Sequence, residues 1–270
     1  MSELLVLVIF LVIGYFSGIL VGLMGIGGGL VFVPVLYYFL PLFNIPQDQL
    51  AYFVIGTSMF AGSLASLSSG TLHIRAKNVV LNKAFLLAFG SVLSAFIAPF
   101  FIVKIESRIL QLIFAAVFTI LAIKMLLEHS DKTVKTSKIK LENYFLPFFG
   151  ILIGTVSAFT GIGGGILYVP TLILLYGVDP KPAVGTSSVV TSFTMVSSTA
   201  SFFLQSSVPV STGFHIGYIY LSAGIPLGLG AIAGSFLGVK FAIKASSIII
   251  KKIFSVLLIV VVLRIIFDLW

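Results

Sequence analysis

The sequence predicts an all-α integral membrane protein made of two inverted structural repeats, and three observations support this prediction. First, 59% of the 270 residues are hydrophobic and 9% are charged, whereas a soluble domain carries roughly 25% charged residues. Second, apolar runs long enough to cross a bilayer recur along the whole chain. Third, the same glycine-rich segment occurs once in each half. Each repeat is predicted to hold a long and a short helix joined by a glycine-rich break, followed by three transmembrane helices.

The composition excludes several classes of protein. A mean hydropathy of +1.21 leaves too little polar surface for a soluble enzyme or a nucleic-acid-binding module. The net charge of +8 comes mainly from Lys and Arg between apolar runs, which indicates orientation in a membrane. The chain has no cysteine, so thiol chemistry is excluded. Its first residues have no basic region or cleavage site and are predicted to form a retained first helix.

The apolar runs are predicted to be helices, because backbone in lipid must satisfy its own hydrogen bonds. They are 4–24, 30–43, 51–70, 84–103, 109–127, 145–160, 166–177, 183–204, 217–239 and 252–269. Runs 30–43 and 166–177 span only about 20 Å at 1.5 Å per residue, and each follows a glycine cluster. The number of helices that cross the membrane therefore stays open between eight and ten.

The two halves of the chain align along most of their length. Residues 18–36 and 154–172 are identical at nine of 19 positions. The Gly-Thr-Ser segments at Gly56 and Gly185, and the last apolar runs, follow in the same order. Such order predicts an internal repeat. We divide the chain into a first repeat (1–128), a linker (129–143) and a second repeat (144–270).

The loop charges predict the orientation of the repeats. If each half crosses the membrane an odd number of times, loops 71–83, 129–143, 178–182 and 239–252 share one side and hold twelve Lys and Arg residues. Loop 205–216, equivalent to 71–83, holds none. The positive-inside rule then places the linker in the cytoplasm and both termini outside. Odd crossing makes the halves an inverted repeat in the cell membrane, the inner membrane of a bacterium.

The glycine clusters Gly25–Gly29 and Gly161–Gly165 are the strongest candidate for a site. Glycine adopts positive φ and leaves the backbone accessible, and a broken helix in lipid is tolerated only inside protein or beside a water-filled cavity. Each cluster begins a short helix, whose free N–H groups and positive dipole end attract anions. Two clusters that enter from opposite faces would meet near the midplane, where inverted-repeat transporters bind substrate. Tight turns and close packing are the alternative for each cluster alone.

Hydroxyl groups follow each cluster and could assist an anion. The Gly-Thr-Ser pairs are predicted to begin the next helix of each half, where they would cap it or donate to an anion. Packing by small residues is the alternative, and we favour packing for the neighbouring hydroxyls. Those neighbours are Ser63, Ser66, Thr191, Ser192 and Ser198. Glycine ridges on three predicted helices indicate close helix packing. The ridges are 14/18/22, 150/154/158 (Ala at 158) and 230/234/238. Pro34 and Pro170 are expected to shape the short helices.

The acidic and histidine residues do not indicate catalysis. All eight acids lie in loops or near run ends, so coupling through a buried carboxylate is not supported. His73, His129 and His215 are assigned to loops, as solvated or interfacial side chains rather than ligands. No group has the spacing of a metal site, and no apolar run holds a catalytic pair. We expect no enzyme activity, cofactor or metal.

The sequence resembles the TauE/SafE family of sulfite and organosulfur-anion permeases. The resemblance rests on the motif from Gly22 to Pro34, its looser copy from Ala158 to Pro170, and the Gly-Thr-Ser segments, and it covers nearly the whole chain. It implies a permease for small sulfur-containing anions such as sulfite, thiosulfate or sulfonates. The chemistry of the residues alone predicts only that the substrate is an anion. That the anion contains sulfur is implied by the resemblance.

The sequence therefore predicts a secondary transporter that works by alternating access. A passive anion channel or uniporter is the first alternative, and a membrane scaffold without transport is the second. The expected partners are the anion and the lipid bilayer, with no nucleic acid; a homo-oligomer stays open. The predicted substrate-binding residues are Gly25, Gly27, Gly28, Gly29, Leu30, Thr57, Ser58, Gly161, Gly163, Gly164, Gly165, Ile166, Thr186 and Ser187.

Overall fold

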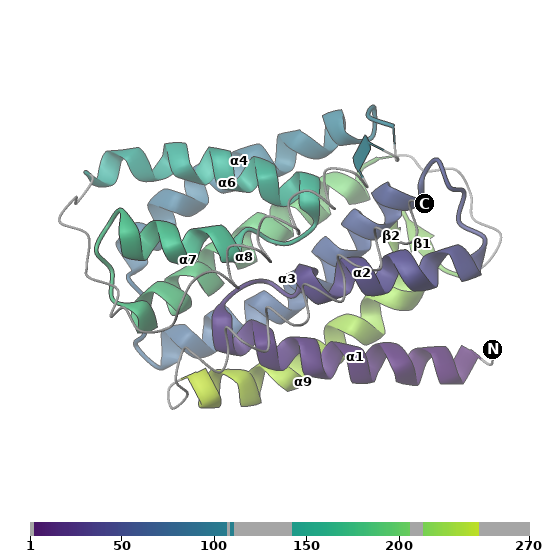
Figure 1. Cartoon of the computed structure of the whole chain (residues 1–270), viewed down its shortest axis with the longest axis horizontal. Coiled ribbons are helices and arrows are strands. Elements are labelled where there is room, and N and C mark those ends of the chain that lie inside the picture. Colours follow the sequence, from purple (N-terminus) through teal and green to yellow (C-terminus); the bar gives the residue numbers. More distant parts are fainter. Residues whose placement is uncertain (1–2, 107–108, 111–141, 206–212, 243–270) are drawn as a thin grey trace, which may run out of the picture.

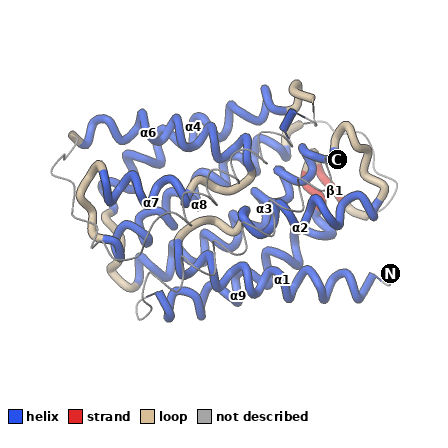
Figure 2. The backbone as a smooth tube through the Cα atoms, viewed as in Figure 1, coloured by secondary structure: helices blue, strands red, loops and turns tan. Residues whose placement is uncertain are grey.

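The structure is a computed structural model, and it describes residues 3–106, 109–110, 142–205 and 213–242. Helices make up most of this part of the chain (Figure 2). The helices of the first half are α1 (Glu3–Met24), α2 (Gly29–Phe39), the 3-10 turn η1 (Leu40–Phe43), α3 (Leu50–Arg75) and α4 (Leu81–Ile102). Those of the second half are the 3-10 turn η2 (Asn143–Phe145), α6 (Leu146–Thr160), α7 (Gly165–Leu174), α8 (Pro180–Phe203) and α9 (Leu221–Ala242). The predicted run 252–269, and most of the run 109–127 and of the linker 129–143, lie outside the described residues.

The two halves are interleaved. Helix α1 packs along α9, and α6 packs along α4 in the equivalent way. Helix α3 packs on α8 and α9, while α8 also packs on α4. Figure 1 shows the α1–α9 pair along one edge of the molecule and the α4–α6 pair along the other, with α3 and α8 between them. Each half therefore supplies one helix to each outer pair.

Glycines allow the outer pairs to pack closely, as the ridges predicted. A β-carbon on Gly22 would lie 2.6 Å from the carbonyl oxygen of Ser235, and one on Gly18 would lie 2.6 Å from Ala231 Cα. In the α4–α6 pair, a β-carbon on Gly154 would lie 2.8 Å from Ser91 Cα. Such contacts let two backbones approach without a side chain between them.

The burial pattern fits a bilayer. The outer helices expose large apolar side chains, such as Phe16, Phe89, Phe148 and Leu229. Most residues of α3, in contrast, are buried. Among the described residues, five helices are long and apolar enough to cross a membrane: α1, α3, α4, α9 and the segment Asn143–Thr160. Helix α8 is not one of them, because Ser and Thr residues lower its hydropathy. The chain is an all-α membrane protein in its architecture.

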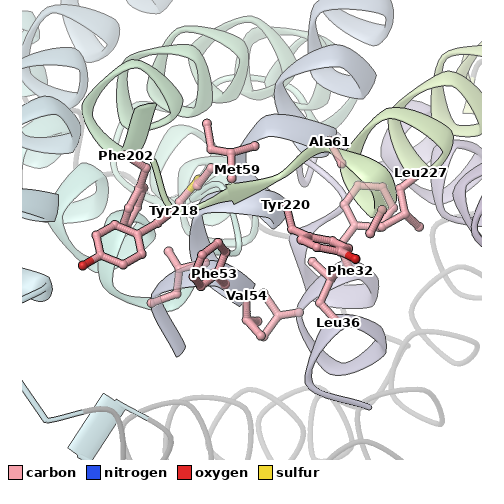
Figure 3. Packing of buried hydrophobic residues seen from close by; sticks show 14 of the residues in the cluster. Phe32, Leu36, Phe53, Val54, Met59, Ala61, Phe202, Tyr218, Tyr220 and Leu227 are labelled. Carbon is pink, nitrogen blue, oxygen red and sulfur yellow. The ribbon is translucent and has the colours of Figure 1, made fainter. Parts of the chain in front are cut away.

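A short hairpin interrupts the helical pattern before α9. Strands β1 (His215–Ile216) and β2 (Ile219–Tyr220) pair antiparallel around Gly217, whose φ is +54°. The predicted helix over 217–239 therefore begins later, at Leu221. Tyr218 and Tyr220 of the hairpin join Phe53 of α3 in a buried apolar cluster (Figure 3). The hairpin thereby fixes the start of α9 against the interior.

Candidate functional site

The two glycine breaks meet at the centre of the structure (Figure 2). A β-carbon on Gly29 would overlap the carbonyl oxygen of Gly161 and lie 2.7 Å from Ile162 Cα. In the matching contact, a β-carbon on Gly165 would overlap the carbonyl oxygen of Gly25. Only glycine fits at Gly29 and Gly165, because each of these residues is seated directly on the backbone of the opposite break.

Positive φ angles produce both breaks. Residues 25, 27 and 28 have φ of +68°, +82° and +80°, and residues 161, 163 and 164 have +70°, +93° and +77°. Other residues rarely adopt such angles. The left-handed Gly28 and Gly164 occupy the N-cap positions of α2 and α7. Both short helices therefore point their N-termini at the contact between the breaks.

The N–H groups at these helix starts have no acceptor in the described part of the chain. In the part of the chain that the structure describes, the amides of residues 27–30 and 163–166 donate to no protein acceptor. The first hydrogen bonds come from Val31 and Phe32 to the Gly28 carbonyl, both at 3.0 Å, and from Leu167 and Tyr168 to the Gly164 carbonyl. Residues 27–30 and 163–165 are buried, and Ile166 is half-buried. Buried unpaired donors at a helix start make a ready site for an anion.

Serines cross-link the two breaks. Ser58 of α3 donates through Oγ to the Gly161 carbonyl at 2.8 Å. Ser187 of α8 donates to the Gly25 carbonyl at 3.0 Å and also lies 3.2 Å from the Gly165 carbonyl. Each serine thus orients the break of the other half.

The neighbouring threonines each bind the residue just before a long helix of the opposite half. Thr57 Oγ1 accepts the Tyr220 N–H at 2.9 Å, and Thr186 Oγ1 accepts the Val80 N–H at the same distance. The prediction that these segments begin their helices is wrong, because α3 starts at Leu50 and α8 at Pro180. The hydroxyls therefore do not cap their own helices; they satisfy N–H groups beside the starts of α9 and α4.

The other hydroxyls divide into two groups. Ser63, Ser66 and Ser192 donate to carbonyls of their own helices, at 2.7, 2.7 and 2.8 Å, as the packing interpretation expects. Thr191 Oγ1 and Ser198 Oγ are buried and have no hydrogen-bond partner among the described residues. Thr191 also lies against the first break, since a β-carbon on Gly27 would be 2.6 Å from its Cγ2. Thr191 therefore contacts the first break through its methyl group, and its unpaired hydroxyl makes it a candidate member of the anion site on α8.

The assignment of His73 to a loop is wrong. It lies in the last turn of α3 and is fully buried, because α3 continues past the predicted end of the run. Its Nε2 is 3.1 Å from the Gly22 carbonyl, and its Nδ1 is 3.4 Å from Asn78 Nδ2. The Gly22 carbonyl is one of the last four of α1, which have no partner within their own helix. His73 therefore ties the end of α1 to α3. Half-buried His215 lies in β1, and His129 lies outside the described residues.

Relatives of similar length identify the class of protein. The chain is 34% identical over 255 residues to a "Probable membrane transporter protein" of Haemophilus influenzae, covering 94% of this chain and 96% of the relative. It is 30% identical to one of Methanocaldococcus jannaschii, covering 90% and 89%. It is 24% identical to "Probable membrane transporter protein YunE" of Bacillus subtilis, covering 97% of both. No solved structure matches the chain significantly. With its apolar helices, the chain is a multi-pass membrane transporter.

The family follows from a match over nearly the whole chain. Residues 10–265 match the family described as "Sulfite exporter TauE/SafE", and the chain belongs to this family. The motifs that suggested the family in the sequence are the two breaks that meet in the structure.

Proposed function

We propose that the chain is a secondary transporter of small sulfur-containing anions, with its binding site between the two glycine breaks. The observation that carries this proposal is the meeting of two buried helix N-termini whose N–H groups are unpaired among the described residues. An unpaired buried polar group costs about 1–3 kcal/mol, and an oxyanion with several acceptor oxygens would satisfy many such groups at once. The family description, a sulfite exporter, supports sulfur as the central atom.

Within this site the predicted residues have two roles. The N–H groups of residues 27–30 and 163–166 bind the anion, and the unpaired Thr191 hydroxyl adds a side-chain donor. The hydroxyls at Thr57, Ser58, Thr186 and Ser187 already bind backbone groups of the opposite half. They position the breaks for the anion.

The mechanism that we propose is alternating access by two inverted repeats, residues 1–128 and 144–270. The matched contacts of the halves support it, since α1–α9 and α6–α4 are equivalent pairs with glycine ridges. Such ridges let two backbones approach closely, and we infer that one slides along the other when the repeats move. The charged loops favour a cytoplasmic linker at 129–143 with both termini outside. A fixed site at the repeat interface would then open to each side in turn.

The test is uptake of labelled sulfite into liposomes that contain the purified chain. A carrier shows saturable uptake and counterflow, in which unlabelled sulfite inside the liposome accelerates entry of the label. Flux without saturation or counterflow would favour a channel instead. Absence of flux for sulfite, thiosulfate and a small sulfonate, with folded protein, would contradict the proposal. Parallel runs with and without a pH gradient report whether protons are coupled.

A further inference from the structure

Met195 of α8 packs on both glycine breaks at once. A β-carbon on Gly27 would lie 2.9 Å from Met195 Sδ, and one on Gly163 would lie 2.8 Å from the same sulfur. A β-carbon on Gly62 of α3 would also lie 2.8 Å from it. The thioether therefore fills the space that both breaks and α3 face. The side chain is fully buried.

This side chain breaks the equivalence of the two halves. When the Gly-Thr-Ser segments of α3 and α8 are aligned, Met195 falls opposite Ser66. Ser66 is small, donates to the Gly62 carbonyl of its own helix at 2.7 Å, and lies 3.9 Å from Met195 Sδ. Only the second half places a bulky group between the breaks at this position. Because Met195 lies where the two breaks meet and has no bulky counterpart in the first half, it is a candidate for the residue that selects among anions.

We propose that Met195 is the size-selecting gate of the anion site; the proposal rests on the function proposed above. An anion that contacts the N–H groups of both breaks must occupy space beside Gly27 and Gly163, which the thioether fills. Methionine is unbranched and flexible, so its side chain can withdraw without movement of α8. The room that it leaves sets the largest anion that passes. When it returns, an apolar group closes the path between the breaks.

A packing role alone makes a different prediction. Methionine often fills irregular gaps in protein interiors, and Met59 of α3 is another fully buried methionine. If both only pack, truncation of either residue lowers stability and leaves the preference among anions unchanged. The preference among anions of different size therefore distinguishes a gating role of Met195 from a packing role.

The first experiment compares Met195→Ala, Met195→Leu and Met59→Ala in liposomes, with sulfite and the bulkier benzenesulfonate as substrates. We expect Met195→Ala to raise the benzenesulfonate-to-sulfite uptake ratio by at least about tenfold, the lower end of the discrimination that one methylene group gives. Met195→Leu conserves volume and should keep the wild-type ratio. Met59→Ala should lose stability without changing the ratio. An unchanged ratio in folded Met195→Ala overturns the gate and leaves the transporter intact.

The second experiment needs no known substrate. The chain has no cysteine, so Met195→Cys carries the only thiol. We expect a methanethiosulfonate reagent that bears a sulfonate group to label Met195→Cys in membranes, and methanesulfonate, a small sulfonate that does not react with the reagent, to slow this labelling. Met59→Cys should stay unlabelled. Met195→Cys that is not labelled contradicts the gate. Labelling that methanesulfonate does not slow, together with absent wild-type flux of sulfite and of methanesulfonate, contradicts the proposed function instead.

Discussion

The hydroxyl of Ser58 lies 2.8 Å from the carbonyl oxygen of Gly161, 103 residues further along the chain. The matching bond joins Ser187 to the Gly25 carbonyl, 162 residues away. Each half thus holds the other's break in place. A serine that holds a carbonyl also fixes the peptide plane of that carbonyl, so the N–H of Ile162 in one break and of Ile26 in the other keeps a single direction.

The first prediction concerns these serines. Ser58→Ala and Ser187→Ala each leave a buried carbonyl unpaired, so each should destabilise the protein by about 1–3 kcal/mol. Thermal unfolding in detergent measures the loss. Ser63→Ala is the control, since Ser63 donates only to Phe60 in its own helix and should lose less. Equal melting temperatures for Ser58→Ala and wild type would show that the cross-link does not stabilise the fold.

The second prediction separates the hydroxyl from the shape of Thr57. Thr57→Val removes the acceptor of the buried Tyr220 N–H, so it should lower the melting temperature and the sulfite uptake rate together. Thr57→Ser keeps the oxygen and should preserve both. If Thr57→Val behaves like wild type in both measurements, the hairpin before α9 does not depend on this bond.

The third prediction concerns the glycine ridge. Gly18→Ala places a methyl group 2.6 Å from Ala231 Cα, and overpacking of this kind costs about 1–3 kcal/mol. The control is Gly70→Ala, where the nearest atom is the Ser192 hydroxyl at 3.1 Å, which can rotate away. Melting temperatures should fall for Gly18→Ala and stay level or rise for Gly70→Ala. A level melting temperature for Gly18→Ala would mean that α1 and α9 can separate at little cost.

The fourth prediction tests the link from His73 to α1. His73→Phe leaves the Gly22 carbonyl without its 3.1 Å partner. Phe202, which is also fully buried, occupies the aligned position of the second half. We expect a lower melting temperature for His73→Phe and partial recovery for His73→Gln, whose amide can donate. Equal losses in both variants would mean that the ring, rather than its hydrogen bond, stabilises this region.

Much of the fold follows from the sequence, because lipid imposes long apolar helices. The breaks at Gly25–Gly29 and Gly161–Gly165, and the close packing of the ridges, were predicted correctly. Hydropathy places helix ends poorly where a helix continues beyond its apolar run: the run 51–70 matches the start of α3 at Leu50 but not its end at Arg75, and this misplaced His73. It also overlooked the hairpin, because Ile219 and Tyr220 are as apolar as the helix that follows.

The candidate site was only partly predictable. The repeat indicated both breaks, because glycine clusters at equivalent positions of the two halves suggest a common role. It gave no sign that Ser58 and Ser187 reach the opposite half, because long-range hydrogen bonds leave no local pattern. Met195 resembles any other apolar residue of a membrane helix. One signal was available: alignment of the repeats places this large side chain opposite Ser66.

The most direct test of an anion site between the breaks is the KM for sulfite uptake in Thr191→Val. Thr191 Oγ1 is buried and has no hydrogen-bond partner among the described residues, and the Cγ2 methyl of the same side chain lies against Gly27. Removal of the hydroxyl should therefore leave folding intact. We predict a KM about tenfold higher, the cost of one hydrogen bond to a charged group. Thr199→Val, which removes another unpaired hydroxyl of α8, should leave the KM unchanged. A wild-type KM in folded Thr191→Val, or equal changes in both variants, would contradict the site.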